Sequence, residues 1–163
     1  HRKATANLND LFRYNKVNKT YWAVVEGGPK EDSGEIDMPL GRLDDTIGWW
    51  MKRDPNGLPS QTTWKVMGRT DGMKWLALEP ITGRTHQLRV HCSEMGWPIV
   101  GDAIYGNAPR HDGPPMHLHA RAIEVPLYKN KAPVKAVAPV PAHMRELLKA
   151  CGWNAEEKSA PAA

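Results

Sequence analysis

Apolar and polar positions along the chain predict a succession of short strands. Runs rich in β-branched and aromatic residues, bounded by turn-forming residues, favour strands over residues 19–26, 62–69, 73–80, 117–127 and 134–137. The second and third runs flank Thr70-Asp71-Gly72, a sequence typical of the tight turn of a β-hairpin. Because residues 75–78 are apolar in succession, we expect this arm of the hairpin to lie centrally in the sheet, covered on both faces.

Helical spacing of apolar residues predicts a helix that ends at Gly96. Leu88, Cys92 and Met95 recur at positions i, i+4 and i+7, and glycine is the residue that most often follows a helix end. Arg89 falls on the neighbouring face of this helix. Its side chain is therefore expected to point away from the packed stripe.

Three further segments receive weaker predictions. Residues 7–14 and 143–151 have short stretches of helical spacing, so we expect a short helix in each. Residues 30–60 are polar and interrupted by Pro and Gly, and we expect them to form at most a short ribbon without a core of its own. Residues 153–163 are small and polar, which predicts a flexible tail after a single domain that spans residues 1–152.

Composition and charge narrow the class of protein. The net charge is +4, which is compatible with a nucleic-acid partner but does not by itself indicate one. The apolar runs are too short to cross a membrane, and no signal peptide is visible. Two cysteines without disulfide or metal-binding spacing are typical of a reduced, intracellular protein, so we expect a cytoplasmic location. The chain opens at His1 rather than at Met, which favours a fragment or a processed product.

Several kinds of site find no support in the sequence. The seven histidines lack a matching set of cysteines or carboxylates, so no metal is expected. No phosphate-binding Walker loop, dinucleotide-binding glycine motif or hydrolase nucleophile elbow is present, so no nucleotide cofactor is expected. Cys92 lies on the packed stripe of the predicted helix, where a thiol is usually inert.

The segment before the central helix concentrates polar side chains. Arg84, Thr85, His86 and Gln87 occupy the junction between a loop and the helix N-terminus. Such a junction, rich in hydrogen-bond donors, attracts anions, and phosphates are the commonest of these. An equally good interpretation from these residues alone is a solvated first turn with ordinary capping.

A set of motifs in consistent order resembles one enzyme family. Gly83-Arg-Thr-His-Gln-Leu-Arg89, then Gly96-x-Pro-Ile-x-Gly-Asp102 and Tyr105-Gly106, closely resembles the C-terminal motif of RluA-type pseudouridine synthases. Upstream, the segment from Val17 to Gly27 resembles the family's tyrosine motif. Thr62-x-Trp64 and Leu118-His-Ala120 are similar to two further strands of the family.

The resemblance implies a fold, an activity and site residues. The fold is expected to be α/β of the α+β type, with a mixed, largely antiparallel sheet and packed helices. The family converts uridine to pseudouridine in RNA without a metal or an organic cofactor. For this protein, the RNA is expected to be large-subunit rRNA or tRNA. Tyr21 matches the active-site tyrosine, and Arg89 matches the arginine that pairs with the catalytic aspartate. The residues that we predict to contact RNA are Arg84, His86, Gln87, Thr85, Arg69 and Arg110.

The chain departs from the family at the nucleophile. The aspartate of the family belongs to a His-Arg-Leu-Asp motif well upstream of the tyrosine, whereas this chain begins His1-Arg2-Lys3-Ala4, with Lys in place of Leu and Ala in place of Asp. We therefore expect the nucleophile to lie beyond these residues. Asp10 has no motif around it, and Asp102 is expected to fix a turn instead.

Two alternatives to this interpretation remain at this point. An inactive RNA-binding module derived from the same fold would also match the sequence. A zinc-dependent deaminase would need a His/Cys set that is not found here.

Overall fold

The structure, a computed structural model, describes residues 17–43, 50–126 and 134–154. Its main feature is a six-stranded sheet in which every neighbouring pair is antiparallel, with the strand order β2-β5-β6-β1-β7-β8. The strands are β1 (Asn18–Glu26), β2 (Ser33–Asp37), β5 (Gln61–Thr70), β6 (Met73–Pro80), β7 (Leu118–Val125) and β8 (Val134–Val137). A separate two-stranded ribbon pairs β3 (Leu40–Arg42) with β4 (Met51–Arg53).

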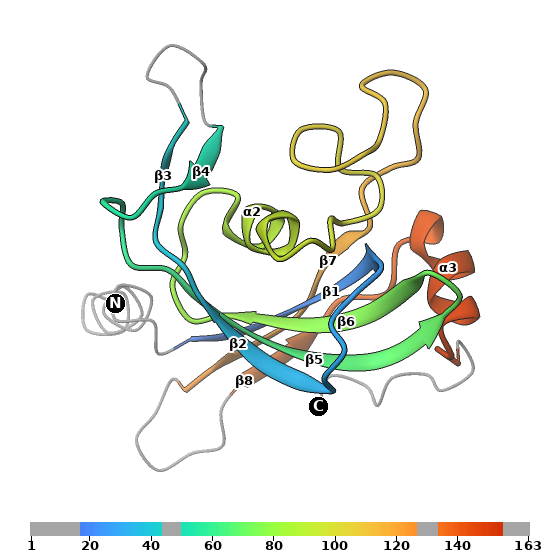
Figure 1. Ribbon diagram of the computed structural model, residues 1–163. Coiled ribbons are helices and arrows are strands. Elements are labelled where there is room, and N and C mark those ends of the chain that lie inside the picture. Colours follow the sequence, from blue (N-terminus) through green and yellow to red (C-terminus); the bar gives the residue numbers. More distant parts are fainter. Residues whose placement is uncertain (1–16, 44–49, 127–133, 155–163) are drawn as a thin grey trace.

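Helices cover the two faces of the sheet at different places. Helix α2 (Gln87–Glu94) crosses one face, and the ribbon and the loop that precedes β7 rise from the sheet on either side of it (Figure 1). A short 3₁₀ turn (Ala142–Met144) and helix α3 (Arg145–Ala150) pack at one end of the sheet. This arrangement confirms the expected α+β class, with a largely antiparallel sheet and few helices.

Alternation along β1 explains why the sheet has two cores. Ala23 and Val25 are fully buried on the face that carries α2, in a cluster with Leu76, Leu78 and Leu88. Val24 is fully buried on the opposite face, with Met144 and Leu148. At about 25 cal/mol per Å² of buried apolar surface, these two layers supply the main stabilisation of the domain.

The predicted strands and the central helix are confirmed. The hairpin turns at residues 71–72, and β6 lies between β5 and β1, with Trp75, Leu76 and Leu78 buried. Gly96, with φ of 90°, follows the end of α2 in the left-handed conformation that glycine adopts without strain. The predicted helix over residues 7–14 lies outside the described residues.

Two boundaries differ from the predictions. Residues 30–60 do form a short ribbon, but they also supply β2, which places Ile36 in the main core together with the neighbouring Met38. Trp153, which we assigned to the tail, is half-buried against the cluster under α3, and its backbone N–H donates to the Leu148 carbonyl at 2.9 Å. The domain therefore extends at least to Trp153, because this indole ring adds apolar contact to that core.

In the described part of the chain, no helix is long and apolar enough to span a bilayer.

Candidate active site

A pocket of about 340 Å³ opens between the sheet and the loop that leads into α2. It contains both predicted catalytic residues, Tyr21 from β1 and Arg89 from α2. The remaining walls come from β1, the 80–88 segment and the approach to β7; they are formed by Lys19, Pro80, Thr82, Gly83, Arg84, His86, Gln87, Leu88, Met116 and Leu118. An aromatic ring and a guanidinium that lie far apart in the sequence thus share one cavity.

Tyr21 reaches the pocket because β1 lies in the middle of the sheet. It pairs with Leu78 of β6 on one side and with Ala120 of β7 on the other. The register of the β1–β7 pair shifts between Thr20 and Tyr21, so a local irregularity occurs at this residue. The ring is half-buried against the core under α2, which holds one part of it in place and leaves the rest to the pocket.

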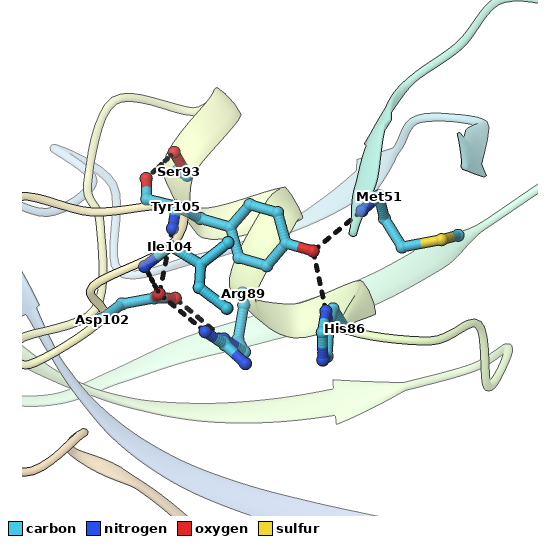
Figure 2. Close-up of polar contacts among 7 residues, drawn as sticks. All are labelled: Met51, His86, Arg89, Ser93, Asp102, Ile104 and Tyr105. Atoms are coloured by element: carbon cyan, nitrogen blue, oxygen red, sulfur yellow. Dashed lines mark hydrogen bonds and ion pairs between the residues drawn. The ribbon is translucent and has the colours of Figure 1, made fainter. Parts of the chain in front are cut away.

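Arg89 forms a bidentate ion pair with Asp102. Its Nε donates to Oδ2 at 2.9 Å and its Nη2 donates to Oδ1 at 2.8 Å (Figure 2). The side chain of Asp102 is 1% exposed and that of Arg89 is 15% exposed, so the pair is largely shielded from water. Two parallel bonds of this kind fix the plane of the guanidinium as well as its position.

Asp102 also closes the turn that follows it. Its Oδ1 accepts the backbone N–H groups of Ile104 and Tyr105, both at 3.0 Å, which confirms that this residue fixes a turn. Burial acts to raise the pKa of Asp102, but the hydrogen bonds from Arg89 and from the two backbone N–H groups outweigh it and hold the pKa below its usual value. Asp102 is therefore ionised at neutral pH and fully engaged.

His86 lies at the other side of the pocket in an unusual backbone conformation. With φ of 54°, it occupies the left-handed region, which is strained for a residue other than glycine. Its Nδ1 lies 2.7 Å from the hydroxyl oxygen of Tyr105. Burial, and after it the nearby Arg89 guanidinium, lowers the pKa of His86, so the ring is neutral at pH 7.

The structure divides the other predicted RNA contacts into two groups. Arg84 and His86 line the pocket, and Thr85 is exposed between them. Arg69 pairs loosely with Asp32 at 3.7 Å near the far end of β5, and Arg110 stacks on the Trp50 ring at 5.1 Å. Neither Arg69 nor Arg110 lines the pocket.

The contacts of Gln87 argue against the prediction that this side chain binds RNA. It is only 3% exposed, and its amide oxygen accepts from the Thr82 hydroxyl at 2.6 Å and from the Arg84 N–H at 3.0 Å. Its amide nitrogen donates to the Gln61 carbonyl at 2.8 Å and to Thr62 Oγ1 at 2.9 Å. An amide whose groups are all used inside the protein has none left for RNA, so Gln87 shapes the loop.

Sequence reasoning missed the part that Tyr105 plays. Its hydroxyl contacts His86 and the backbone of Met51 at 2.8 Å, and its ring lies 5.0 Å from the guanidinium carbon of Arg89. The Tyr105-Gly106 pair was visible as part of a motif, but nothing in its spacing indicated these partners.

Among the described residues, no three His, Cys, Asp or Glu side chains come together as a metal site would require.

The comparisons with known proteins agree on one class, the pseudouridine synthases. The family model for RNA pseudouridylate synthase matches residues 1–94. An uncharacterized RNA pseudouridine synthase of Zymomonas mobilis is 37% identical over 147 residues, which cover 89% of this chain and 67% of the relative. RNA pseudouridylate synthase domain-containing protein 1 of Danio rerio is 36% identical over 142 residues, 80% of this chain and 47% of that protein.

Solved structures agree with the sequence comparisons. Human RNA pseudouridylate synthase domain containing 1 superposes with a TM-score of 0.69 at 32% identity, over 86% of this chain and 62% of that one. Human RNA pseudouridylate synthase domain containing 4 superposes with a TM-score of 0.72 at 26% identity, over 93% and 68%. The chain belongs to the RNA pseudouridylate synthase family, a family of isomerases. It spans 67% of the length of the Zymomonas mobilis relative and about half of the length of most of the other curated relatives it matches.

Proposed function

We propose that the complete protein isomerises uridine to pseudouridine in structured RNA, either large-subunit rRNA or tRNA. The observation that carries this proposal is the pocket that Tyr21 and Arg89 share. The target base must leave its stack to be reached, and a half-buried aromatic ring beside a cavity is a suitable surface on which to receive it. Arg84 also lines this pocket and would contact the phosphate backbone.

In this proposal the nucleophile is an aspartate supplied from outside the described residues, and Arg89 holds it. A guanidinium has five N–H groups, of which Asp102 takes two, so three remain (5 − 2). Within the described part of the chain, those three have no acceptor, and Arg89 lines the pocket. A second carboxylate in the pocket would therefore find donors already oriented, and the positive charge would keep it ionised.

Asp102 is a poor candidate for the nucleophile itself. Its side chain is 1% exposed, both oxygens accept hydrogen bonds, and the residue does not line the pocket. To attack a sugar carbon, it would have to break an ion pair and two backbone hydrogen bonds. Asp10, the other candidate in the sequence, lies outside the described residues.

The test is tritium release from RNA that carries 5-tritiated uridine, with the 163-residue chain and the complete protein in parallel. We expect release from the complete protein and none from the 163-residue chain, although the chain should still bind RNA. Release by this chain alone would mean that the nucleophile is among its own residues. No release by the complete protein on any rRNA or tRNA, with RNA still bound, would favour an RNA-binding module instead.

A further inference from the structure

Tyr105 joins the two polar groups of the pocket without lining the pocket itself. Its ring packs against the Arg89 guanidinium, with 5.0 Å from the guanidinium carbon to the ring centroid, and its hydroxyl lies 2.7 Å from His86 Nδ1. Its backbone is held at both ends, because its N–H donates to Asp102 and its carbonyl accepts from the Ser93 hydroxyl at 2.6 Å. Figure 2 shows these contacts converging on one residue.

The hydrogen bonds of the Tyr105 hydroxyl indicate where the proton of His86 lies. The backbone N–H of Met51 can only donate, so the hydroxyl oxygen accepts at 2.8 Å. The hydroxyl keeps its own proton at neutral pH, because the ordinary pKa of tyrosine is about 10 and burial raises that of Tyr105 further. Among the described residues, the acceptor in reach of that proton is His86 Nδ1. A neutral imidazole that accepts at Nδ1 carries its hydrogen on Nε2.

The other end of the imidazole is turned away from Tyr105. In Figure 2 the edge that carries Nε2 points away from the hydroxyl, on the same side of the Tyr105 ring as the Arg89 guanidinium. His86 and Arg89 both line the pocket, whereas Tyr105 and Asp102 do not. Among the described residues, no group hydrogen-bonds to Nε2, so the Nε2–H group is the part of His86 that can meet a ligand.

We propose that Tyr105 is a positioning residue that presents His86 to the pocket as a fixed hydrogen-bond donor, with its proton on Nε2, beside Arg89. The pocket then offers N–H donors from both side chains, suited to a uracil carbonyl or a phosphate oxygen. The part of this inference that concerns turnover rests on the proposed function. The part that concerns the tautomer does not.

Nitrogen NMR of the 163-residue chain tests the tautomer directly. Two other histidines serve as internal references. His91 must donate from Nε2 to the Met38 carbonyl at 2.9 Å, and His117 must donate from Nδ1 to the Pro115 carbonyl at 2.8 Å. We expect the two-bond proton–nitrogen pattern of His86 to match that of His91. A pattern like that of His117 would overturn the proposal.

Tyr105→Phe keeps the ring against Arg89 and removes only the hydroxyl. We expect His86 to become a mixture of tautomers in this variant, while the signals of His91 and His117 stay in place and show that the fold is intact. Unchanged His86 signals would mean that Tyr105 does not set the tautomer.

Turnover by the complete protein tests the connection to function through a double-mutant cycle. Tyr105→Phe is expected to lower kcat by up to about 100-fold through misplacement of His86, with little change in RNA affinity. In a His86→Ala background the same substitution should have no further effect, because it acts through His86. Additive losses would contradict the proposal. A complete protein without any turnover would instead refute the proposed function and leave the NMR result standing.

Discussion

At the scale of single residues, Arg89 is the group on which the proposed chemistry depends. Asp102 occupies one edge of its guanidinium and Tyr105 covers one face, so the side chain has little freedom to move. Such preorganisation is useful in catalysis because no free energy is spent on orienting the charge during the reaction. The same pair is sensitive to substitution, because removal of either partner leaves a charge that is shielded from water and has no counter-ion.

Replacement of Arg89 by Ala in the complete protein should separate turnover from binding. We expect kcat to fall by about 10²–10³-fold, the usual cost of losing an electrostatic contact to the reacting groups, while RNA affinity changes little. Tritium release and RNA titration measure the two quantities. Equal losses in both would show that Arg89 binds RNA instead.

Two further variants accompany this experiment. Arg89→Ala leaves the Asp102 carboxylate without its cation, so the double variant with Asp102→Asn restores a neutral site and keeps the comparison interpretable if the single variant unfolds. Arg145→Ala is the matched arginine control, because Arg145 is exposed on α3, does not line the pocket and is not among the residues predicted to contact RNA.

At the scale of elements, a buried chain of hydrogen bonds attaches α2 to the sheet. The Gln87 amide donates to Thr62 Oγ1, and the Thr62 hydroxyl donates to His91 Nδ1 at 2.9 Å. His91 in turn donates from Nε2 to the carbonyl of Met38. Both Thr62 and His91 are fully buried, so these bonds form out of contact with water. The chain connects the first turn of the helix, which contains Arg89, to β5.

Thr62→Val keeps the shape of the side chain and breaks this hydrogen-bond chain. We expect it to lower the free energy of unfolding by about 2 kcal/mol, because His91 Nδ1 loses its donor in a dry environment. Urea denaturation of the chain measures the change. Thr63→Val is the matched control on the same strand; its hydroxyl makes only a long 3.5 Å bond, so the expected change is within about 0.5 kcal/mol. Equal effects of both variants would show that the buried chain does not stabilise the helix.

At the scale of the whole molecule, several histidines are held neutral by burial. Burial is the largest cause of the lowered pKa of each of them: His86, His91, His117 and His119. The first two belong to α2 and its N-terminal end, and the last two to β7 and the residue before it. Because a lowered pKa in the folded state means that the unfolded chain binds protons more readily, acid favours unfolding.

The stability of the chain should therefore fall as the pH drops below about 6.5, the ordinary histidine pKa, and be fully present above it. Melting temperatures between pH 8 and pH 5 measure this. His119→Gln should flatten the slope, since glutamine can still donate to the Ala138 carbonyl but does not titrate. His111→Gln, at an exposed position, is the matched control. A melting temperature that rises toward pH 5 would contradict this prediction.

The sequence by itself determined the strands, the central helix and the family, because these follow from local periodicity and from motifs in a fixed order. It also indicated Tyr21 and Arg89 through those motifs. It did not determine which polar side chains face inward: Gln87 and Arg84 are three residues apart in one segment, yet Gln87 is buried, whereas Arg84 is partly exposed and its Nε donates to the Pro59 carbonyl. Nor did it indicate the contacts of Tyr105 with Met51, 54 residues away. Such contacts depend on how the ribbon, α2 and the turn after it pack together, and packing of distant segments leaves no periodic signal in the chain.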